Sequence, residues 1–357
     1  MHCELYIPNF FPSEGLPRGD GLAAAETLIA RGRRRRRALC SPEAWLFGRF
    51  GVARQRDWPV APYTLLADGG APERNYWMRA DPVHLQVGRD SLGLADSTSF
   101  DVSRAESEAL VEALNRHFGQ RMLFHPLQPA RWYVRLQKTP DMQTTPAAAA
   151  RGAALDEKLP SGSDAMRFHA LMNEAQMLLH EHPVNAEREA RGEPALNSVW
   201  FWGGGVIDAA KARPFSAVFA DDPLARGLAL AAAIPVRALP RDSDSVLAAL
   251  GDEGIALVVL NVPREAQPRE RRAALERDWF LPLLAALKSG RIGMLTLHLC
   301  GADSLLEVET VRSDLRYFWR LRKPLSAYAL CACHSEGEAR RICFAVRKKA
   351  DPSLRSG

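Results

Sequence analysis

Short apolar segments that alternate with helical patterns constrain the fold of this chain more than any other feature. The segments are apolar on both faces, as buried parallel strands are. Such alternation predicts an α/β sheet with helices on both faces. In the last helical pattern, Pro282 is expected to bend or split the helix. The expected strands are 4–7, 197–202, 216–220, 255–260 and 292–299, and the expected helices are 224–233, 242–250 and 268–287.

Composition and length place the chain among ordinary globular proteins. It has 357 residues, of which 47% are hydrophobic and 25% charged, and this length favours about two domains. The 47 Lys and Arg residues against 42 Asp and Glu are too mild an excess to indicate nucleic acid. No apolar run is long enough for a membrane span. Residues 1–12 lack the basic region of a signal peptide, and the six cysteines are irregularly spaced, so we expect a reducing cytoplasm and no membrane partner.

A different pattern interrupts the series of apolar strands. Residues 83–87 and 131–136 alternate between polar and apolar, as half-exposed strands do. Between them, Ser103 and Glu106 have the spacing of a capping box, which predicts the start of a helix. We therefore expect a small α+β insert. The expected domains are a discontinuous core of 1–75 and 162–329, an insert at 76–161 that includes a Pro/Ala-rich linker, and a basic carboxy-terminal tail at 330–357. The sequence leaves open whether this tail is ordered or disordered.

A long block of specific positions lies between residues 182 and 205. It reads HPVN, then an arginine, a glycine and PALN, and it leads into WFWGGG. This block resembles the HPxN…R…G…PAN…WxWGxG pattern of the archaeal-type, cofactor-independent phosphoglycerate mutases, which are metal-dependent members of the alkaline-phosphatase superfamily. The resemblance covers most of residues 1–320. It implies an α/β fold with an alkaline-phosphatase-like core and a mainly parallel sheet, interrupted by a small α+β inserted domain.

Five further motifs are spread along the chain. They are ADPVHL at 80–85, LNRHF at 114–118, RWYxRL at 131–136, HPVN at 182–185 and DDPLxRGLA at 221–229. In these motifs the chain resembles the bacterial RpfE-type regulatory proteins more closely than the mutases, over nearly the same span. That resemblance implies a regulatory role with no assigned chemistry.

The chain departs from the mutase pattern where that family holds its two metals and its nucleophile. Two-metal phosphoryl transfer needs several hard ligands. Where the family has Asp-Gly after the first strand, this chain has Asn9, and where it has an Asp and a His after 255–260, this chain has Arg264 and Pro268. An Asp-His pair after the last strand is replaced by His298 and its neighbour, and only Ser41 stands in the nucleophile segment.

These replacements favour the loss of the phosphoryl chemistry, because an arginine would repel the cations. We expect no metal, no cofactor and no catalytic residue, and hence a pseudoenzyme with a regulatory or metabolite-sensing role. The alternative is a divergent phosphoglycerate mutase-like phosphomutase or phosphatase. His298 is otherwise expected to be a core residue with a buried partner.

A polar pocket for a phosphorylated or carboxylated metabolite could remain at the end of the strand at 197–202. An arginine there could bind either anion in bidentate fashion. In the alternative interpretation, the asparagines are caps, the arginine pairs with a glutamate and the glycines form a turn. A protein partner is equally open. The candidate ligand-binding residues are Asn185, Arg188, Asn197, Trp202, Gly203 and Gly205.

Two further clusters have both a functional and a structural interpretation. Arg31 and Arg33–Arg37 could contact the phosphates of a nucleic acid, but they follow the helical pattern of 22–30, and cations suit a helix carboxyl end. We favour the helix end, so no nucleic-acid partner is expected. Near the carboxy terminus, potential zinc ligands have a spacing that matches no common zinc knuckle. These are Cys331, Cys333, His334 and Cys343.

Overall fold

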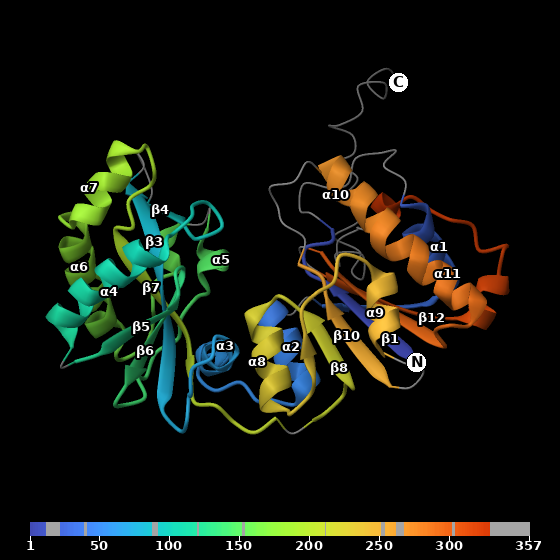
Figure 1. The fold of residues 1–357 in the computed structure, drawn as a ribbon, viewed down its shortest axis with the longest axis horizontal. Coiled ribbons are helices and arrows are strands. Elements are labelled where there is room, and N and C mark those ends of the chain that lie inside the picture. Colours follow the sequence, from blue (N-terminus) through green and yellow to red (C-terminus); the bar gives the residue numbers. More distant parts are fainter. Residues whose placement is uncertain are drawn as a thin grey trace, which may run out of the picture. The chain divides into compact units, whose positions relative to one another are not determined.

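The computed structural model forms two compact units (Figure 1). Unit 1 comprises Met1–Pro42, Phe215–Asp221 and Val236–Gly357, and unit 2 comprises Glu43–Pro214 and Asp222–Pro235. The residues described below are 1–11, 22–38, 41–87, 92–119, 121–151, 154–210, 212–250, 254–261, 268–301 and 304–328. The expected tail at 330–357, Arg264 and the possible zinc ligands lie outside them.

Unit 1 contains a large, mostly parallel sheet with the strand order β2-β12-β11-β1-β10-β8-β9. β1, β8, β9, β10 and β11 run parallel, and β12 and β2 continue one edge in antiparallel fashion. The mixed α/β class with a mainly parallel sheet, expected from the apolar segments, is confirmed. The strands are β1 (His2–Ile7), β2 (Arg33–Ala38), β8 (Ala217–Ala220), β9 (Val236–Arg237), β10 (Ile255–Val259), β11 (Met294–Cys300) and β12 (Ser304–Val311).

The helices of unit 1 pack against this sheet through one apolar cluster. Leu5, from β1, lies in the cluster with Leu28 and Leu287 from two of the helices. The expected bend at Pro282 takes the form of a π-helical segment, Glu276–Phe280, directly before the proline's helix. A wider turn accommodates a residue that has no N–H to donate. The helices are α1 (Ala23–Arg31), α9 (Ser243–Leu250), α10 (Pro268–Leu275) and α11 (Leu281–Ser289).

The arginine run forms an edge strand, so the expected helix end is wrong for Arg33–Arg37. The helix α1 stops at Arg31, and the next residue, Gly32, has an extended backbone with ψ 166°. The arginines then pair with β12, where Arg33 lies opposite Glu309 and Arg35 opposite Glu307. Every residue of β2 is exposed. Edge strands often carry charge because it discourages pairing with other chains.

Unit 2 is built on an antiparallel sheet with the order β4-β3-β6-β5, and β7 also pairs with β3. The helices α4, α6 and α7 contribute to the apolar cluster on one face, and α3 packs on Trp77 and Tyr133 of the other face. Its elements are α2 (Pro42–Phe50), α3 (Val60–Ala67), β3 (Tyr76–Val87), β4 (Leu92–Ala95), α4 (Arg104–Phe118), β5 (Leu123–Gln128), β6 (Arg131–Leu136), α5 (Ala147–Ala150), α6 (Ala165–His180), α7 (Pro183–Ala190), β7 (Ser198–Gly205) and α8 (Pro223–Ala231).

The strand β7 corrects one sequence-based expectation. The sequence predicts that residues 197–202 belong to the parallel sheet, because the run is apolar on both faces. The structure pairs β7 antiparallel with β3, from Ser198 opposite Val83 to Gly205 opposite Trp77. Both faces of this smaller sheet are covered, so a strand within it is also apolar on both sides. Unit 2 is therefore larger than the insert expected at 76–161.

Two local expectations within unit 2 have different outcomes. The capping box is confirmed, since the Ser103 hydroxyl accepts from the Glu106 N–H at 3.2 Å and the Glu106 carboxylate accepts from the Ser103 N–H at 2.8 Å. The Pro/Ala-rich segment is not a plain linker, because it contains α5 and buries Ala147, Ala150 and Leu155 in the apolar cluster.

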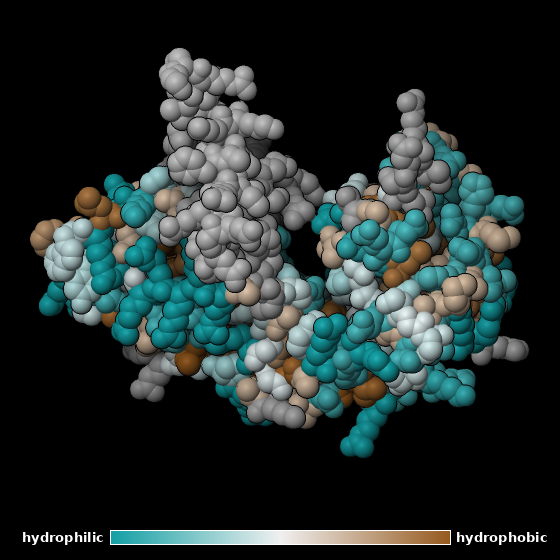
Figure 2. All heavy atoms as spheres, turned by 180° about the vertical axis from the view of Figure 1, so that it is seen from behind, coloured by the Kyte–Doolittle hydropathy of each residue, from teal (hydrophilic) through white to brown (hydrophobic). Residues whose placement is uncertain are grey.

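Among the described helices, none is both long and apolar enough to cross a membrane. Figure 2 shows one face of the molecule, where hydrophilic residues predominate and apolar residues stand out in small groups.

Candidate functional site

Among the described residues, the side chains that follow the carboxyl ends of the parallel strands in unit 1 include two asparagines and an aspartate. Asn9 follows β1 with a φ of 55°, a left-handed conformation that asparagine tolerates better than most residues. Asn261 follows β10. After β8, the carboxylate of Asp221 accepts a hydrogen bond from the Leu239 N–H at 3.1 Å. Within the described residues, no group of three or more His, Cys, Asp or Glu side chains is arranged to hold a metal ion.

His298 lies in the body of the sheet rather than at a strand end. It stands on β11 opposite Tyr6 of β1. Its Nε2 is 3.0 Å from a carboxylate oxygen of Glu4, and its Nδ1 is 3.7 Å from Glu307 on β12. All three ionisable side chains are buried. The expectation of a core histidine with a buried partner is confirmed, although the sequence did not indicate which carboxylates would face it.

Asn185 and Asn197 bind backbone groups on neighbouring segments. The Asn185 amide donates to the carbonyl of Leu179 at 2.7 Å and to that of Leu196 at 3.1 Å, and it accepts from the Leu196 N–H at 2.7 Å. The Asn197 side chain accepts from the Leu85 N–H at 2.8 Å and donates to the Leu85 carbonyl at 2.9 Å. Both amides therefore join the approach to β7 to the rest of unit 2, as the capping interpretation predicted.

Arg188 is fully buried and has a protein partner for every nitrogen. Its Nε donates to the Pro194 carbonyl at 2.8 Å, and Nη2 donates to the Asp101 carbonyl at 3.0 Å. Nη1 lies 3.1 Å from Glu106 and 3.4 Å from Glu193. Arg188 borders a cavity of about 750 Å³, but its guanidinium joins α4, α7 and the loop after α7 to one another.

Trp202 belongs to a buried charged network that sequence reasoning missed. Its indole N–H donates to Asp81 at 2.8 Å. Arg79 lies 5.2 Å from the Trp202 ring and 5.4 Å from the Tyr133 ring, and it donates to Asp81 at 2.7 and 2.9 Å. Burial raises the pKa of Asp81, while Arg79 and Trp202 oppose that rise. The only sequence signal was an arginine and an aspartate two residues apart, on one face of a strand.

The glycines at the end of β7 allow close approach to neighbouring chain segments. Gly203 has a φ of +64°, and a Cβ there would lie 3.0 Å from Val60. A Cβ on Gly205 would lie 2.4 Å from Pro59. The Gly203 N–H donates to the Thr144 hydroxyl at 3.1 Å, and that hydroxyl donates to the buried carboxylate of Asp57.

Asp57 provides a pH-dependent contribution to stability. Burial raises its pKa, although hydrogen bonds from Thr144 and the charge of Arg54 oppose the rise. The unfolded carboxyl, with a pKa of about 3.9, loses its proton at lower pH than the folded one does. Stability from this group therefore falls as pH rises from about 4 through the raised folded pKa, and is constant above it.

Urea unfolding of wild type and Asp57→Asn at a series of pH values measures this effect. We expect the unfolding free energy of the wild type, relative to that of Asp57→Asn, to fall as pH rises through that window. The assignment would be contradicted if the relative unfolding free energy of the wild type stayed constant with pH or rose.

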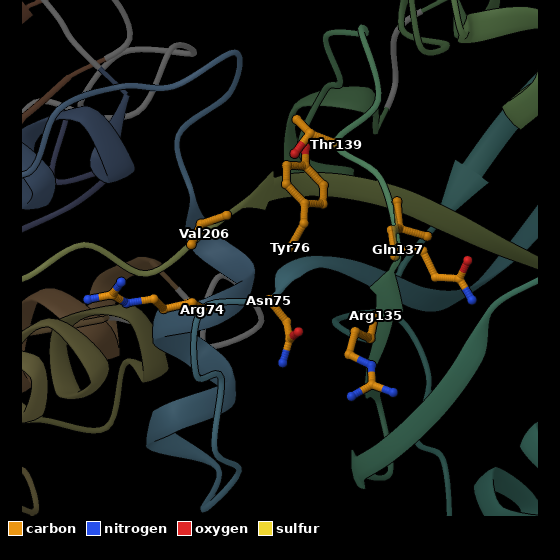
Figure 3. Close-up of a pocket in the computed structure, with 8 residues that line it drawn as sticks. Arg74, Asn75, Tyr76, Arg135, Gln137, Thr139 and Val206 are labelled. Atoms are coloured by element: carbon orange, nitrogen blue, oxygen red, sulfur yellow. The ribbon is translucent and has the colours of Figure 1, made fainter.

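A second cavity, of about 480 Å³, lies in unit 2 beside the ends of β3, β6 and β7. Its polar side chains do not converge. In Figure 3 the side chain of Arg74 points away from that of Arg135, and Tyr76 points toward Thr139. Each arginine can attract an anion, but the two side chains diverge and do not bind one anion together.

The six candidate ligand-binding residues therefore do not form one pocket. Asn185 and Arg188 lie on α7, Asn197 lies at the start of β7, and Trp202, Gly203 and Gly205 lie toward its other end. Successive strand residues are separated by about 3.3 Å, so the two ends of β7 are far apart.

Comparison with known proteins finds matches to a phosphoglycerate mutase family over part of the chain. The sequence model described as 2,3-bisphosphoglycerate-independent phosphoglycerate mutase matches residues 73–185. A probable enzyme of that name from Geobacter sulfurreducens is 31% identical over 129 residues, which cover 36% of this chain and 32% of the relative. The enzyme of Methanothrix thermoacetophila is 29% identical over 180 residues, covering 44% of this chain and 45% of the relative. The matches thus span less than half the length of either relative.

The solved structures show the likeness of the fold. The PH0037 protein from Pyrococcus horikoshii superposes with a TM-score of 0.54 over 87% of each chain, at 11% sequence identity. Identity at this level supports the fold alone. Together, the matched sequence segment and the named relatives relate this chain to the 2,3-bisphosphoglycerate-independent phosphoglycerate mutases.

Proposed function

We propose that this chain is a regulatory binding protein of the RpfE type that lacks the metal-dependent phosphoryl transfer of the mutases. The observation that carries the proposal is Asn9, a neutral amide at the end of β1, where the resemblance implies a metal-binding aspartate. Its carbonyl could approach a cation but would bring no charge. A two-metal centre depends on several charged ligands to hold its cations.

The surroundings of His298 support the same proposal. Its Nε2 lies 3.0 Å from a carboxylate oxygen of Glu4, inside the sheet, in a contact between two neighbouring strands. A histidine that ligates a metal instead directs a free nitrogen lone pair to the cation. His298 is thus engaged away from the strand ends where ligands bind in open α/β sheets.

The location of the sequence match supports retention of the fold with a changed role. Residues 73–185 lie entirely in unit 2, and the parallel sheet of unit 1 lies outside that segment. A shared fold does not carry a shared reaction. We place the protein in the cytoplasm, because Cys3 and Cys300 are buried free thiols and burial raises the pKa of Cys3 to about 12.

The alternative function is a divergent phosphomutase or phosphatase, and the activity for which the relatives are named favours it. An activity assay separates the two. The purified full chain is incubated with 3-phosphoglycerate and Mn²⁺, Mg²⁺ or Zn²⁺, with and without EDTA, beside the mutase of Methanothrix thermoacetophila as a positive control.

We expect no EDTA-sensitive formation of 2-phosphoglycerate, with a rate at least ~10³-fold below the control, because a lost metal centre removes several kcal/mol of transition-state stabilisation. EDTA-sensitive turnover within about tenfold of the control would overturn the proposal and identify an enzyme. A thermal-shift series with phosphoglycerates then tests for metabolite sensing, because a ligand at 100 times its Kd adds about 2.7 kcal/mol of stability.

A further inference from the structure

The segment Arg316–Lys323 of unit 1, here called the aromatic loop, exposes large apolar side chains next to one another. It reads RYFWRLRK. Phe318 is 74% exposed, Trp319 62% and Leu321 79%. Single exposed apolar residues are common on protein surfaces, but a cluster of large ones marks a surface that contacts something apolar.

Cations surround this apolar tip within the aromatic loop. Arg316, Arg320, Arg322 and Lys323 are all exposed. Arg320 lies over the Tyr317 ring at 4.6 Å and donates to the Arg31 carbonyl at 2.9 Å. The loop is thereby fixed beside Arg31, two residues before the start of the arginine-rich edge strand.

The strand β2 extends the cationic surface from the aromatic loop. After the loop, the chain reaches Tyr328, whose ring lies 5.7 Å below Arg34 and whose carbonyl accepts from Arg36 at 2.7 Å. The contacts of Arg31 and Tyr328 thus place the loop segment along β2. All five arginines of β2 are exposed, and two glutamates face them across the strand pair, at positions 307 and 309. Positive charge therefore predominates on this edge.

We propose that the aromatic loop and β2 form a contact surface for an anionic lipid bilayer. The arginines bind phosphate headgroups, and Phe318, Trp319 and Leu321 enter the interfacial region. Interfacial anchors combine these features, namely Trp, Phe and Leu on an apolar tip with Lys and Arg around it. This is attachment to a surface and needs no spanning helix. The sequence alone predicts no membrane partner, because an anchor of this kind requires no long apolar run.

The arrangement of the rings favours lipid over nucleic acid. Binding of single strands needs open ring faces on which bases stack. Trp319 packs edge-to-face against Tyr317, at 5.2 Å and 66°, and against Phe318, at 5.3 Å and 82°. Arg320 covers one face of Tyr317, and Leu321 has no ring. The loop therefore exposes apolar side chains surrounded by cations, and not a flat aromatic surface on which bases could stack.

Co-sedimentation of the full chain with vesicles tests the proposal. We expect binding to vesicles of phosphatidylcholine with phosphatidylglycerol, weaker binding to phosphatidylcholine alone, and a decrease with added salt. The double variant Arg33→Gln/Arg35→Gln should lower the partition coefficient about 25-fold, from about 1 kcal/mol for each cation. The triple variant Phe318→Ser/Trp319→Ser/Leu321→Ser should lower it at least tenfold through the lost apolar burial.

Matched controls lie in unit 2. Arg74→Gln/Arg135→Gln removes two exposed arginines, and Met166→Ser/Met177→Ser removes two apolar side chains that are 75% and 74% exposed. Both controls should bind vesicles as the wild type does, and thermal melts should show all variants folded.

Three results would overturn the proposal. The first is wild-type protein that fails to sediment with anionic vesicles, including the case in which it binds single-stranded oligonucleotides instead. The second is equal loss of binding in the control variants. The third is a wild-type dimer that the triple variant converts to a monomer without any change in vesicle binding, because the surface would then join two copies of the chain.

Discussion

Replacing Arg188 by alanine is expected to destabilise unit 2 by about 3–5 kcal/mol, the usual cost of removing one partner from a buried ion pair. The substitution leaves the carbonyls of Pro194 and Asp101 without this donor, and it removes a cation 3.1 Å from Glu106. Buried acceptors that lose a donor pay their full desolvation cost.

Urea unfolding followed by tryptophan fluorescence measures this effect. The reporting residues suit the question, because six of the eight tryptophans, at positions 45, 58, 77, 132, 200 and 202, lie in unit 2. The matched control is Arg191→Ala. Arg191 also binds Glu106, at 2.7 Å, but its side chain is 47% exposed, so we expect a loss of no more than about 1 kcal/mol.

Arg188→Lys refines the test. Lysine keeps the charge but cannot direct donors to three separate acceptors as the planar guanidinium does, so we expect a loss between those of the alanine variants. Should Arg188→Ala unfold at the same urea concentration as wild type, the buried contacts would contribute little. That result would favour the interpretation of Arg188 as a ligand-binding residue.

How much of the structure the sequence could predict depends on the range of the interactions. The capping box at Ser103 and the apolar faces of β1 and β11 are set by neighbours along the chain, and these predictions hold. Which sheet β7 joins depends on contacts with residues that are distant in the sequence. A segment that is apolar on both faces satisfies either sheet, and periodicity cannot distinguish between them.

In the candidate site, too, local contacts could be predicted from the sequence and long-range contacts could not. For Asn185 and Arg188, the structural alternative to ligand binding named partners of the kind that the structure contains, since Asn185 binds backbone groups and Arg188 contacts a glutamate. The network of Arg79, Asp81 and Trp202 was not foreseen, because it depends on the register between β3 and β7. The edge strand of arginines was missed for a related reason. A run of one charged residue has no periodicity, and its extended conformation comes from pairing with β12.

Gly227→Ala is the second substitution for which we expect a large effect, a loss of about 3 kcal/mol, at the upper end of the usual cost of overpacking. The helices α3 and α8 of unit 2 cross at this glycine. A Cβ there would lie 1.9 Å from the carbonyl oxygen of Tyr63 and 2.5 Å from its carbonyl carbon. These are backbone atoms, so no side-chain rotation relieves the overlap, and one helix must shift.

Gly48→Ala is the matched control, because Gly48 also lies in a helix of unit 2 and a Cβ there meets nothing within 4 Å. Alanine is the better helix former by about 1 kcal/mol, so this variant should unfold at slightly higher urea than wild type. Equal midpoints for the two alanine variants would contradict the packing argument. A large loss at Gly227 alone gives the glycine of the DDPLxRGLA motif a physical role, since it allows two helices to approach to backbone contact.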